Sequence, residues 1–262
     1  MSIPGGFLDV GGQHLEAVWH GPGPNEAPTL VFLHEGLGCV GMWRDFPPKL
    51  AAATGLGALV YSRRGYGRSE PGPLPRPLDY MQRHARDILP ALLDTAGIKR
   101  VLLVGHSDGA SISLVYAGMY ADDRRLAGLV LEAPHVFCEE LSVRSIAQAR
   151  DAFETGDLRA GLAKYHGHNV DGAFWGWNRA WLDPAFMNWN IEQYLPTIRV
   201  PTLVVQGLDD QYGTPAQVKA IVHGSGGPVE VAMLKDCAHT PHREQEVKTL
   251  AAMTDFVTRI VG

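Results

Sequence analysis

A serine between two glycines is the residue in this chain best placed to do chemistry. Ser107 lies in the pentapeptide 105–109, Gly-His-Ser-Asp-Gly, after the apolar run 101–104 and before residues with helical spacing. This pattern predicts a strand, a sharp turn and a helix, and so tight a turn forces its apical residue toward strained backbone angles. A hydroxyl held there, at the amino end of a helix, can attack a carbonyl carbon. We interpret Ser107 as a nucleophile; the alternative is an ordinary glycine-rich turn that contains a serine by chance.

A serine hydroxyl is a weak nucleophile unless a base removes its proton, and that base needs an orienting carboxylate. Two later loops, each following an apolar run, contain such groups. The first holds Asp209 and Asp210, and the second holds His239 and His242. The chain order of serine, aspartate and histidine is that of hydrolases whose serine lies on a strand-to-helix turn. The sequence therefore predicts a triad built from Ser107, one of these aspartates and one of these histidines.

Alternating strands and helices must position these groups. Short apolar runs separated by helical spacings predict βαβ units, a mostly parallel sheet and helices on both of its faces. The segment 7–19 is predicted to form a hairpin that turns at Gly11-Gly12, at an edge of the sheet. The other predicted strands are 29–33, 58–61, 101–104, 126–132, 200–206 and 228–234. The predicted helices of this part of the chain are 42–53, 78–96, the helix after Ser107, 215–223 and 244–261.

The alternation stops between residue 133 and about residue 195. This segment contains no strand-like run, and its spacing predicts helices at 142–155, 157–166 and 172–181. It also holds four of the six tryptophans, which need burial, so a loose surface elaboration fits it poorly. We predict a helical cap over the carboxyl edge of the sheet, with a core at 1–133 and 196–262 and the cap at 134–195.

Composition and charge narrow the possible partners. The chain has 262 residues, 23 Lys and Arg and 28 Asp and Glu, which gives a net charge of −5. It has no basic stripe, so we expect no nucleic acid and no membrane surface as a partner, and a small-molecule substrate instead. The three widely separated cysteines, Cys39, Cys138 and Cys237, argue against disulfides and a zinc site.

The location and the assembly of the protein are less constrained. No apolar run reaches 18 residues, and the first residues lack the basic and apolar pattern of a leader peptide. We therefore expect a soluble cytoplasmic protein with reduced thiols. The oligomeric state stays open, a homodimer included.

Four motifs taken together resemble the α/β-hydrolase fold family with a helical cap. They are His34-Glu-Gly-Leu-Gly after the third strand, Arg64-Gly-Tyr-Gly-Arg-Ser after the fourth, the turn at Ser107, and the loops with Asp210 and His239. They occur in the family's order, and the resemblance covers nearly the whole chain. It implies an α/β fold with a mostly parallel eight-stranded sheet, helices on both faces and an inserted helical cap. It also implies a serine hydrolase that needs no metal and no organic cofactor.

The resemblance selects among the candidate residues. In similar enzymes the acid stands three residues after the glycine that ends its strand, which selects Asp210; Asp209 is then expected to be a turn residue that accepts backbone N–H bonds. The family's base lies in a short His-x-Pro context, which His239-Thr-Pro matches. His242 is then expected at the start of the last helix.

Two backbone N–H groups are expected to stabilise the oxyanion that forms on attack. The first belongs to the residue after the nucleophile, Asp108. The second comes from the loop after the third strand, where the family usually has His-Gly and this chain has His34-Glu35-Gly36. That departure leaves the second donor open between Gly36 and Leu37, and we assign it to Gly36.

The same departure brings the carboxylate of Glu35 close to the site. We expect Glu35 to form a salt bridge with Arg63 or Arg64; the alternative is that it positions a water or a substrate hydroxyl. His34 is expected to be structural, bonding neighbouring loops. Aromatic residues at helical spacing often form the core of a cap, which makes the pocket hard to predict. The candidate substrate contacts are Glu35, Leu37, Phe137, Trp175 and Trp177.

Hydrolysis of a small carboxylic ester through an acyl-enzyme is the leading functional hypothesis, because esters are the commonest substrates of similar enzymes. A serine at the turn argues against relatives that open epoxides or remove halides, which need a carboxylate there. One alternative is hydrolysis of a carbon–carbon bond in a diketone or ring-cleavage product. Another is a proline iminopeptidase, whose amine substrate Glu139 and Glu140 could hold. A third is a hydrolase-like ligand receptor, against which the intact triad weighs.

Overall fold

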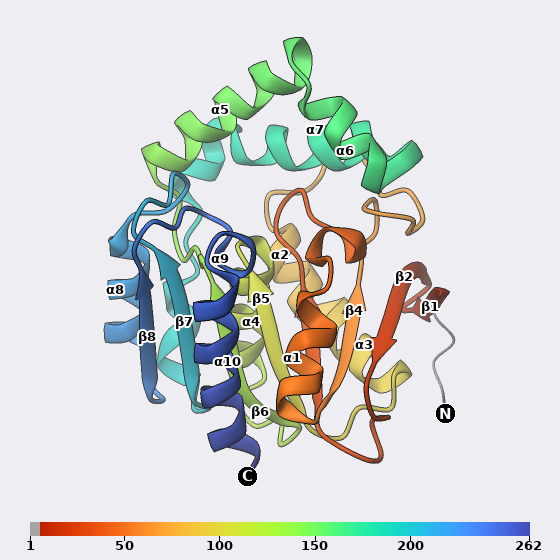
Figure 1. Ribbon diagram of the computed structural model, residues 1–262. Helices are drawn as coiled ribbons and strands as arrows, with labels where there is room; N and C mark the ends of the chain where they lie inside the picture. Colours follow the sequence, from red (N-terminus) through yellow and green to blue (C-terminus); the bar gives the residue numbers. More distant parts are fainter. Residues whose placement is uncertain (1–5) are drawn as a thin grey trace.

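An eight-stranded sheet forms the centre of the molecule, for which the computed structural model describes residues 6–262. The strand order is β1-β2-β4-β3-β5-β6-β7-β8 (Figure 1). The strands β1 and β2 form the expected antiparallel hairpin, β2 runs antiparallel to β4, and every other neighbouring pair is parallel. The strands are β1 (Gly6–Val10), β2 (Gln13–His20), β3 (Thr29–Leu33), β4 (Gly57–Tyr61), β5 (Val101–His106), β6 (Leu126–Glu132), β7 (Thr202–Gly207) and β8 (Val229–Leu234). The predicted eight-stranded, mostly parallel α/β fold is confirmed.

Helices cover both faces of this sheet, and the sheet is correspondingly apolar. Every residue of β3, β4, β5 and β7 is buried, as expected for strands with a helix layer on each side. The helices α1 (Phe46–Thr54) and α10 (Glu246–Val261) pack on one face, whereas α3 (Leu89–Thr95), α4 (Asp108–Met119) and α8 (Pro215–Gly224) cover the other (Figure 1). None of the helices within residues 6–262 combines the length and the apolar character needed to cross a bilayer.

Three predicted helices differ from the structure in how they are divided or where they begin. The helix expected at 42–53 is a 3₁₀ turn, η1 (Val40–Trp43), followed by α1, because Arg44 between them adopts φ 54°. The helix expected at 78–96 is α2 (Tyr80–Arg83), a π-helical segment η2 (His84–Ile88) and α3, which has a proline in its first turn. The helix expected at 244–261 is α10, which begins two residues later, and a separate helical turn, α9 (Pro241–Glu244), precedes it across the non-helical residue Gln245.

The segment between β6 and β7 lies above the sheet edge (Figure 1). It contains α5 (Glu140–Thr155), α6 (Leu158–His166), a short 3₁₀ turn η3 (Gly167–Asn169) and α7 (Val170–Trp181), close to the predicted helices. Two further 3₁₀ segments, η4 (Pro184–Asn188) and η5 (Glu192–Thr197), were not expected. The segment η5 packs on α4 and α8, which are helices of the predicted core and not of the predicted cap. The domain division at 134–195 stays a prediction.

Candidate active site

The backbone at Ser107 has the strained geometry that the sequence predicts. Ser107 joins β5 to α4 with φ 53° and ψ −115°, a conformation that side chains larger than glycine rarely adopt. The flanking glycines are required by packing: a Cβ at Gly109 would lie 1.9 Å from the carbonyl oxygen of Leu33, and one at Gly105 would lie 2.5 Å from that of Gly109. The strand, the helix and β3 therefore close tightly around the serine and hold its position.

A histidine and an aspartate from two later loops form a close pair. His239 follows β8, and its Nδ1 lies 2.9 Å from both carboxylate oxygens of Asp210, which follows β7. Burial raises the pKa of Asp210, but the His239 imidazole and the backbone N–H of Tyr212 outweigh burial and hold this pKa well below its usual range. An ionised Asp210 accepts the Nδ1 proton of His239, which leaves Nε2 of that ring free to take a proton.

Asp209 does not have the turn role that the sequence predicted for its carboxylate. Asp209 is exposed, and its backbone N–H donates to the carbonyl of Cys237. The turn bonds that were expected at its carboxylate go to Asp210, which accepts the N–H groups of Tyr212 and Gly213 at 2.8 and 3.2 Å. One carboxylate therefore both fixes its own loop and orients His239, while the other faces solvent.

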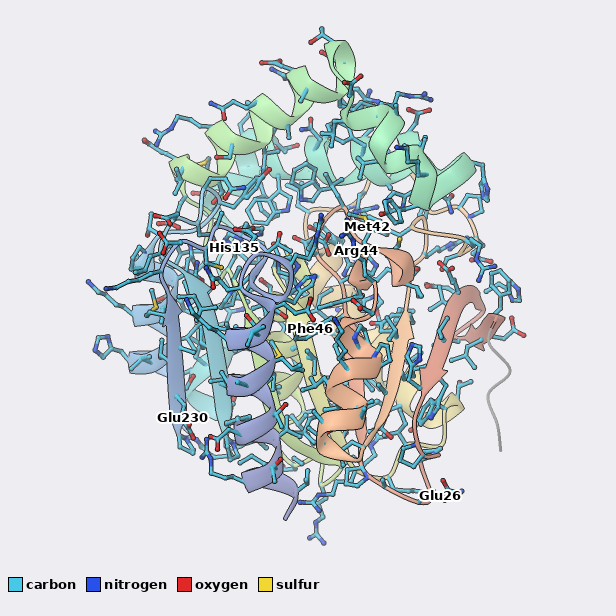
Figure 2. All side chains as sticks on the ribbon, viewed as in Figure 1. Glu26, Met42, Arg44, Phe46, His135 and Glu230 are labelled. Atoms are coloured by element: carbon cyan, nitrogen blue, oxygen red, sulfur yellow. The ribbon has the colours of Figure 1, made fainter. Side chains whose placement is uncertain are left out.

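Ser107 and His239 open into one cavity between the sheet edge and the cap. Its volume is about 300 Å³, within the range of small-molecule sites. The cap side is mostly apolar, and the sheet side carries polar groups. Figure 2 shows two residues of its floor, Met42 and His135, at the end of the sheet nearest the cap helices. The lining residues are Glu35, Gly36, Leu37, Met42, His106, Ser107, His135, Ser142, Ile146, Leu158, Leu162, Trp177, Trp181, Gln211, Tyr212, His239, Thr240 and Arg243.

Three of the five predicted substrate contacts, Glu35, Leu37 and Trp177, line this cavity, and two do not. Phe137 is bonded through its backbone to Gln217, outside the cavity lining. Trp175 packs edge-on against Phe153 within the cap. The prediction of Phe137 and Trp175 as substrate contacts is therefore wrong. For Trp175, helical spacing alone did not distinguish the inward face of α7 from its outward face.

The two carboxylates considered for holding an amine also lie outside the cavity lining. Glu139 accepts hydrogen bonds from the hydroxyl of Thr214 and the amide of Gln217 at 2.6 and 2.8 Å, so it ties the cap entry to α8. Glu140 is exposed and lies beside Arg144 on the same helix. Neither residue supports recognition of an amino group at Ser107.

The carboxylate of Glu35 has a different partner from the one expected. It lies 3.5 Å from Nδ1 of His106, whereas Arg63 donates to the backbone carbonyl of Glu35. Burial lowers the pKa of His106, but Glu35 and Glu132 outweigh it and raise this pKa to about 9. Burial raises the pKa of Glu35, and His106 more than reverses that, so the carboxylate is ionised. The predicted salt bridge to Arg63 or Arg64 is thus replaced by an ion pair with His106.

His34 is structural, as expected. It is fully buried, its Nδ1 lies 2.7 Å from the carbonyl oxygen of Glu35, and its Nε2 accepts the backbone N–H of Arg63 at 3.0 Å. Burial holds the pKa of His34 well below its usual range, so the ring is neutral. It bonds the loop after β3 to the loop after β4.

One expected oxyanion donor, Asp108, lies in the 105–109 turn, and the other, Gly36, lies in the loop after β3. Asp108 is the first residue of α4, so its backbone N–H has no acceptor within the helix. Its carboxylate is fully buried and accepts the Tyr80 hydroxyl at 2.5 Å. Gly36 and Leu37 both line the cavity, and a Cβ at Gly36 would lie 2.2 Å from Nε1 of Trp177. The choice of Gly36 as the second donor stays a prediction.

His135 is a cavity residue that the sequence reasoning missed. It lies three residues beyond β6, is 2 % exposed, and has its ring centroid 5.6 Å from that of His239. Burial lowers the pKa of His135 to about 3, so the ring is neutral. Its position just past the carboxyl end of a parallel strand was the available signal, because such ends gather at one edge of the sheet.

Comparison with known proteins agrees with this geometry. A family model described as the alpha/beta hydrolase fold matches residues 28–184. The chain belongs to the α/β-hydrolase fold family. It is therefore a hydrolase-type enzyme, as the sequence motifs indicate.

Individual relatives of this α/β-hydrolase carry different activities. Epoxide hydrolase B of Mycobacterium tuberculosis is 30% identical over 124 residues, 47% of this chain and 33% of that protein, so the match spans about a third of that relative. The bifunctional esterase/perhydrolase DCH of Acinetobacter calcoaceticus is 24% identical over 72% of this chain and 76% of that protein. The crystal structure of the enol-lactonase from Burkholderia xenovorans LB400 has a TM-score of 0.75 at 22% identity and covers 96% of this chain and 99% of that one. That structural likeness establishes the fold alone.

Proposed function

We propose that this α/β-hydrolase cleaves a small carboxylic ester through an acyl-enzyme on Ser107. His239 Nε2 removes the hydroxyl proton as Ser107 attacks the carbonyl carbon, and Asp210 stabilises the imidazolium that forms. The backbone N–H groups of Asp108 and Gly36 donate to the oxyanion. Collapse expels the alcohol, which receives the proton from His239.

The second half of the reaction uses the same groups. His239 takes a proton from water, the resulting hydroxide attacks the acyl carbon, and Ser107 leaves with that proton as the free acid departs. The observation that carries the proposal is the strained Ser107 opening into the same cavity as the Asp210–His239 pair. The apolar roof of a cavity of about 300 Å³ favours a short or medium acyl or alcohol group.

Fluorophosphonate labelling tests the nucleophile. The wild-type protein should gain one adduct by intact mass, and peptide mapping should place it on Ser107. We expect Ser107→Ala to stay folded, to lose the adduct and to keep less than a few per cent of ester turnover. A folded Ser107→Ala variant that hydrolyses the ester at the wild-type rate would refute the assignment. A folded wild-type protein that neither labels nor turns over would favour the receptor hypothesis.

A substrate panel tests the bond that is cleaved. We expect the highest kcat/KM on p-nitrophenyl esters with short or medium acyl chains. The panel also contains a vinylogous diketone and prolyl-p-nitroanilide, which represent the carbon–carbon hydrolase and the iminopeptidase. A faster rate on either of these, with labelling at Ser107 intact, would keep the nucleophile and replace the ester.

A further inference from the structure

A second cavity lies beside the catalytic one and has a different chemical character. Its volume is about 550 Å³, and it shares no lining residue with the cavity that contains Ser107. It lies on the β2 side of the molecule, between the loop after β4, the segments α2 and η2, and the start of α7. Tyr80 lines it, and the Tyr80 hydroxyl also bonds Asp108 and Trp181, so these side chains form part of the wall between the two cavities.

The second cavity is strongly basic. Four arginines line it, Arg63, Arg64, Arg76 and Arg83, against the single carboxylate of Asp87. That carboxylate pairs with Arg86, outside the lining, at 2.8 Å. A concentration of guanidinium groups in a concave site raises the local concentration of anions wherever a guanidinium is not already paired with a carboxylate.

Three of these arginines already have a carboxylate nearby. Arg64 lies 2.8 Å from Glu70, and Arg83 lies 2.7 Å from Asp79. Arg63 is 3.8 Å from the buried carboxylate of Asp108. The remaining arginine therefore decides what the cavity can bind.

Arg76 is held in place without a carboxylate. Within residues 6–262 it makes no ion pair; its Nη1 donates to the hydroxyl of Tyr66. Its guanidinium lies 4.7 Å from the ring centroid of Tyr66 and 5.3 Å from that of Tyr80. On the cap side it meets a residue without a side chain, Gly176, where a Cβ would lie 2.8 Å from Nη2. The fork is thus fixed between two aromatic rings, and within the described residues only its Nη1 has a hydrogen-bond partner.

We propose that this second cavity binds an organic anion, a carboxylate or a phosphate monoester, whose anionic oxygens accept hydrogen bonds from Arg76. A planar guanidinium matches both groups because each presents two oxygens to its two parallel N–H bonds. One part of the remaining wall is apolar, formed by Pro71, Pro73, Leu74, Pro77 and Ile88, and it suits a ligand with a compact hydrocarbon or aromatic body. The site is separate from Ser107 and does not depend on the proposed ester hydrolysis.

Calorimetric titration with benzoate and with phenyl phosphate, in a chloride buffer, tests the site and distinguishes the two anions. We expect saturable binding of at least one probe to the wild-type protein. Arg76→Gln should weaken it at least about tenfold, because a hydrogen bond to a charged group is lost. Arg243→Gln is the matched control: Arg243 lines the catalytic cavity and likewise makes no ion pair within the described chain. Binding that survives Arg76→Gln and is lost in Arg243→Gln would place the anion at the catalytic cavity and overturn the proposal.

A second variant covers the case in which Arg76→Gln does not fold. Leu74 lines the second cavity and is 50% exposed, so Leu74→Glu adds a negative charge there without disturbing the packed interior. We expect it to weaken binding severalfold, more in low salt than in high salt. Leu208→Glu, at a leucine 48% exposed and outside both cavities, should leave binding unchanged. No saturable binding of either probe at millimolar concentration, or equal effects of the two leucine variants, would refute the site.

Discussion

Two carboxylate–histidine pairs lie at the same edge of the sheet, and their geometry is nearly the same. His239 Nδ1 is 2.9 Å from Asp210, and His242 Nδ1 is 2.8 Å from Glu132. Both carboxylates are buried, and in both burial raises the pKa while the paired histidine contributes to lowering it below the usual value. Distance and electrostatics within the pair therefore do not tell the proposed base from its neighbour.

The surroundings of the two rings differ. His239 lines the cavity that contains Ser107, and the ring of Tyr212 flanks it at 4.7 Å. His242 is packed against Trp43 and Phe46, with centroids 4.6 and 5.5 Å away, and does not line that cavity. A carboxylate orients an imidazole in both places, but only the ring of His239 lines the cavity that contains the candidate nucleophile. A histidine at this edge can therefore act as the base only if its second ring nitrogen can be reached from the cavity.

The largest expected difference between the two pairs is in kcat, when each histidine is replaced by glutamine. His239→Gln removes the group that takes the Ser107 proton, so kcat for ester hydrolysis should fall at least about 10³-fold. His242→Gln should keep kcat within about tenfold, yet lose about 1–3 kcal/mol of unfolding free energy, because an imidazole packed on Trp43 is replaced. Ester kinetics and thermal unfolding of both variants measure this. If His242→Gln were the inactive variant, the assignment of the base would be reversed.

Replacing the carboxylates should separate the two pairs in the same way. Asp210→Asn leaves His239 without an anion to hold its tautomer, and kcat should fall about 10²–10⁴-fold. Glu132→Gln should change kcat little and alter stability instead. Asp209→Asn is the control for the loop, and its kinetics should match those of the wild type because its side chain is exposed. Equal losses in Asp210→Asn and Asp209→Asn would mean that neither aspartate is the orienting acid.

The smallest expected effect concerns His106, which lies between the two pairs. It is a change in how the free energy of unfolding depends on pH. Its centroid is 5.2 Å from that of His239 and 5.3 Å from that of His242. The native ring keeps its proton to a pKa of about 9, whereas the unfolded chain releases it near 6.5. Between these pH values the unfolded state binds fewer protons, so unfolding free energy should be highest below 6.5 and fall as pH rises, by at most about 3 kcal/mol.

Denaturant titrations between pH 6 and 10 of the wild type and of His106→Gln measure this slope. The variant has no proton to release at this position, so its stability should change less over the same interval. Identical slopes in the two proteins would show that His106 is not charged in the native state.

The sequence predicted the frame of the site because that frame depends on local patterns. The run 101–104 followed by Gly-His-Ser-Asp-Gly favours a tight strand-to-helix turn, and the structure shows why both glycines are needed: neither Gly105 nor Gly109 has room for a Cβ. The strand ends that carry Asp210 and His239 were readable from alternating apolar runs. Such features need only the order of residues along one element and its immediate loop.

What the sequence could not show depends on contacts between distant segments. The partner of Glu35 is His106, about 70 residues away, and nothing in the loop after β3 distinguishes it from Arg63 or Arg64. The inward face of the cap was equally hidden, so Trp175 and Trp177 looked alike although one packs within the cap and the other lines the cavity. The break at Arg44 was not expected either, since a positive φ is uncommon for an arginine.

The contact between Gly36 and Trp177 limits how this enzyme can be altered. A side chain of even one carbon at position 36 would lie 2.2 Å from the indole nitrogen, and that indole is only 6 % exposed, with little room to move. A larger residue at position 36 therefore requires a smaller residue at position 177. A mutant library that changes the cavity through residue 36 should recover functional members only where residue 177 has become smaller in the same gene. Substitutions in the loop after β3 and in the cap are therefore coupled at this contact, although the two residues are 141 positions apart in the chain.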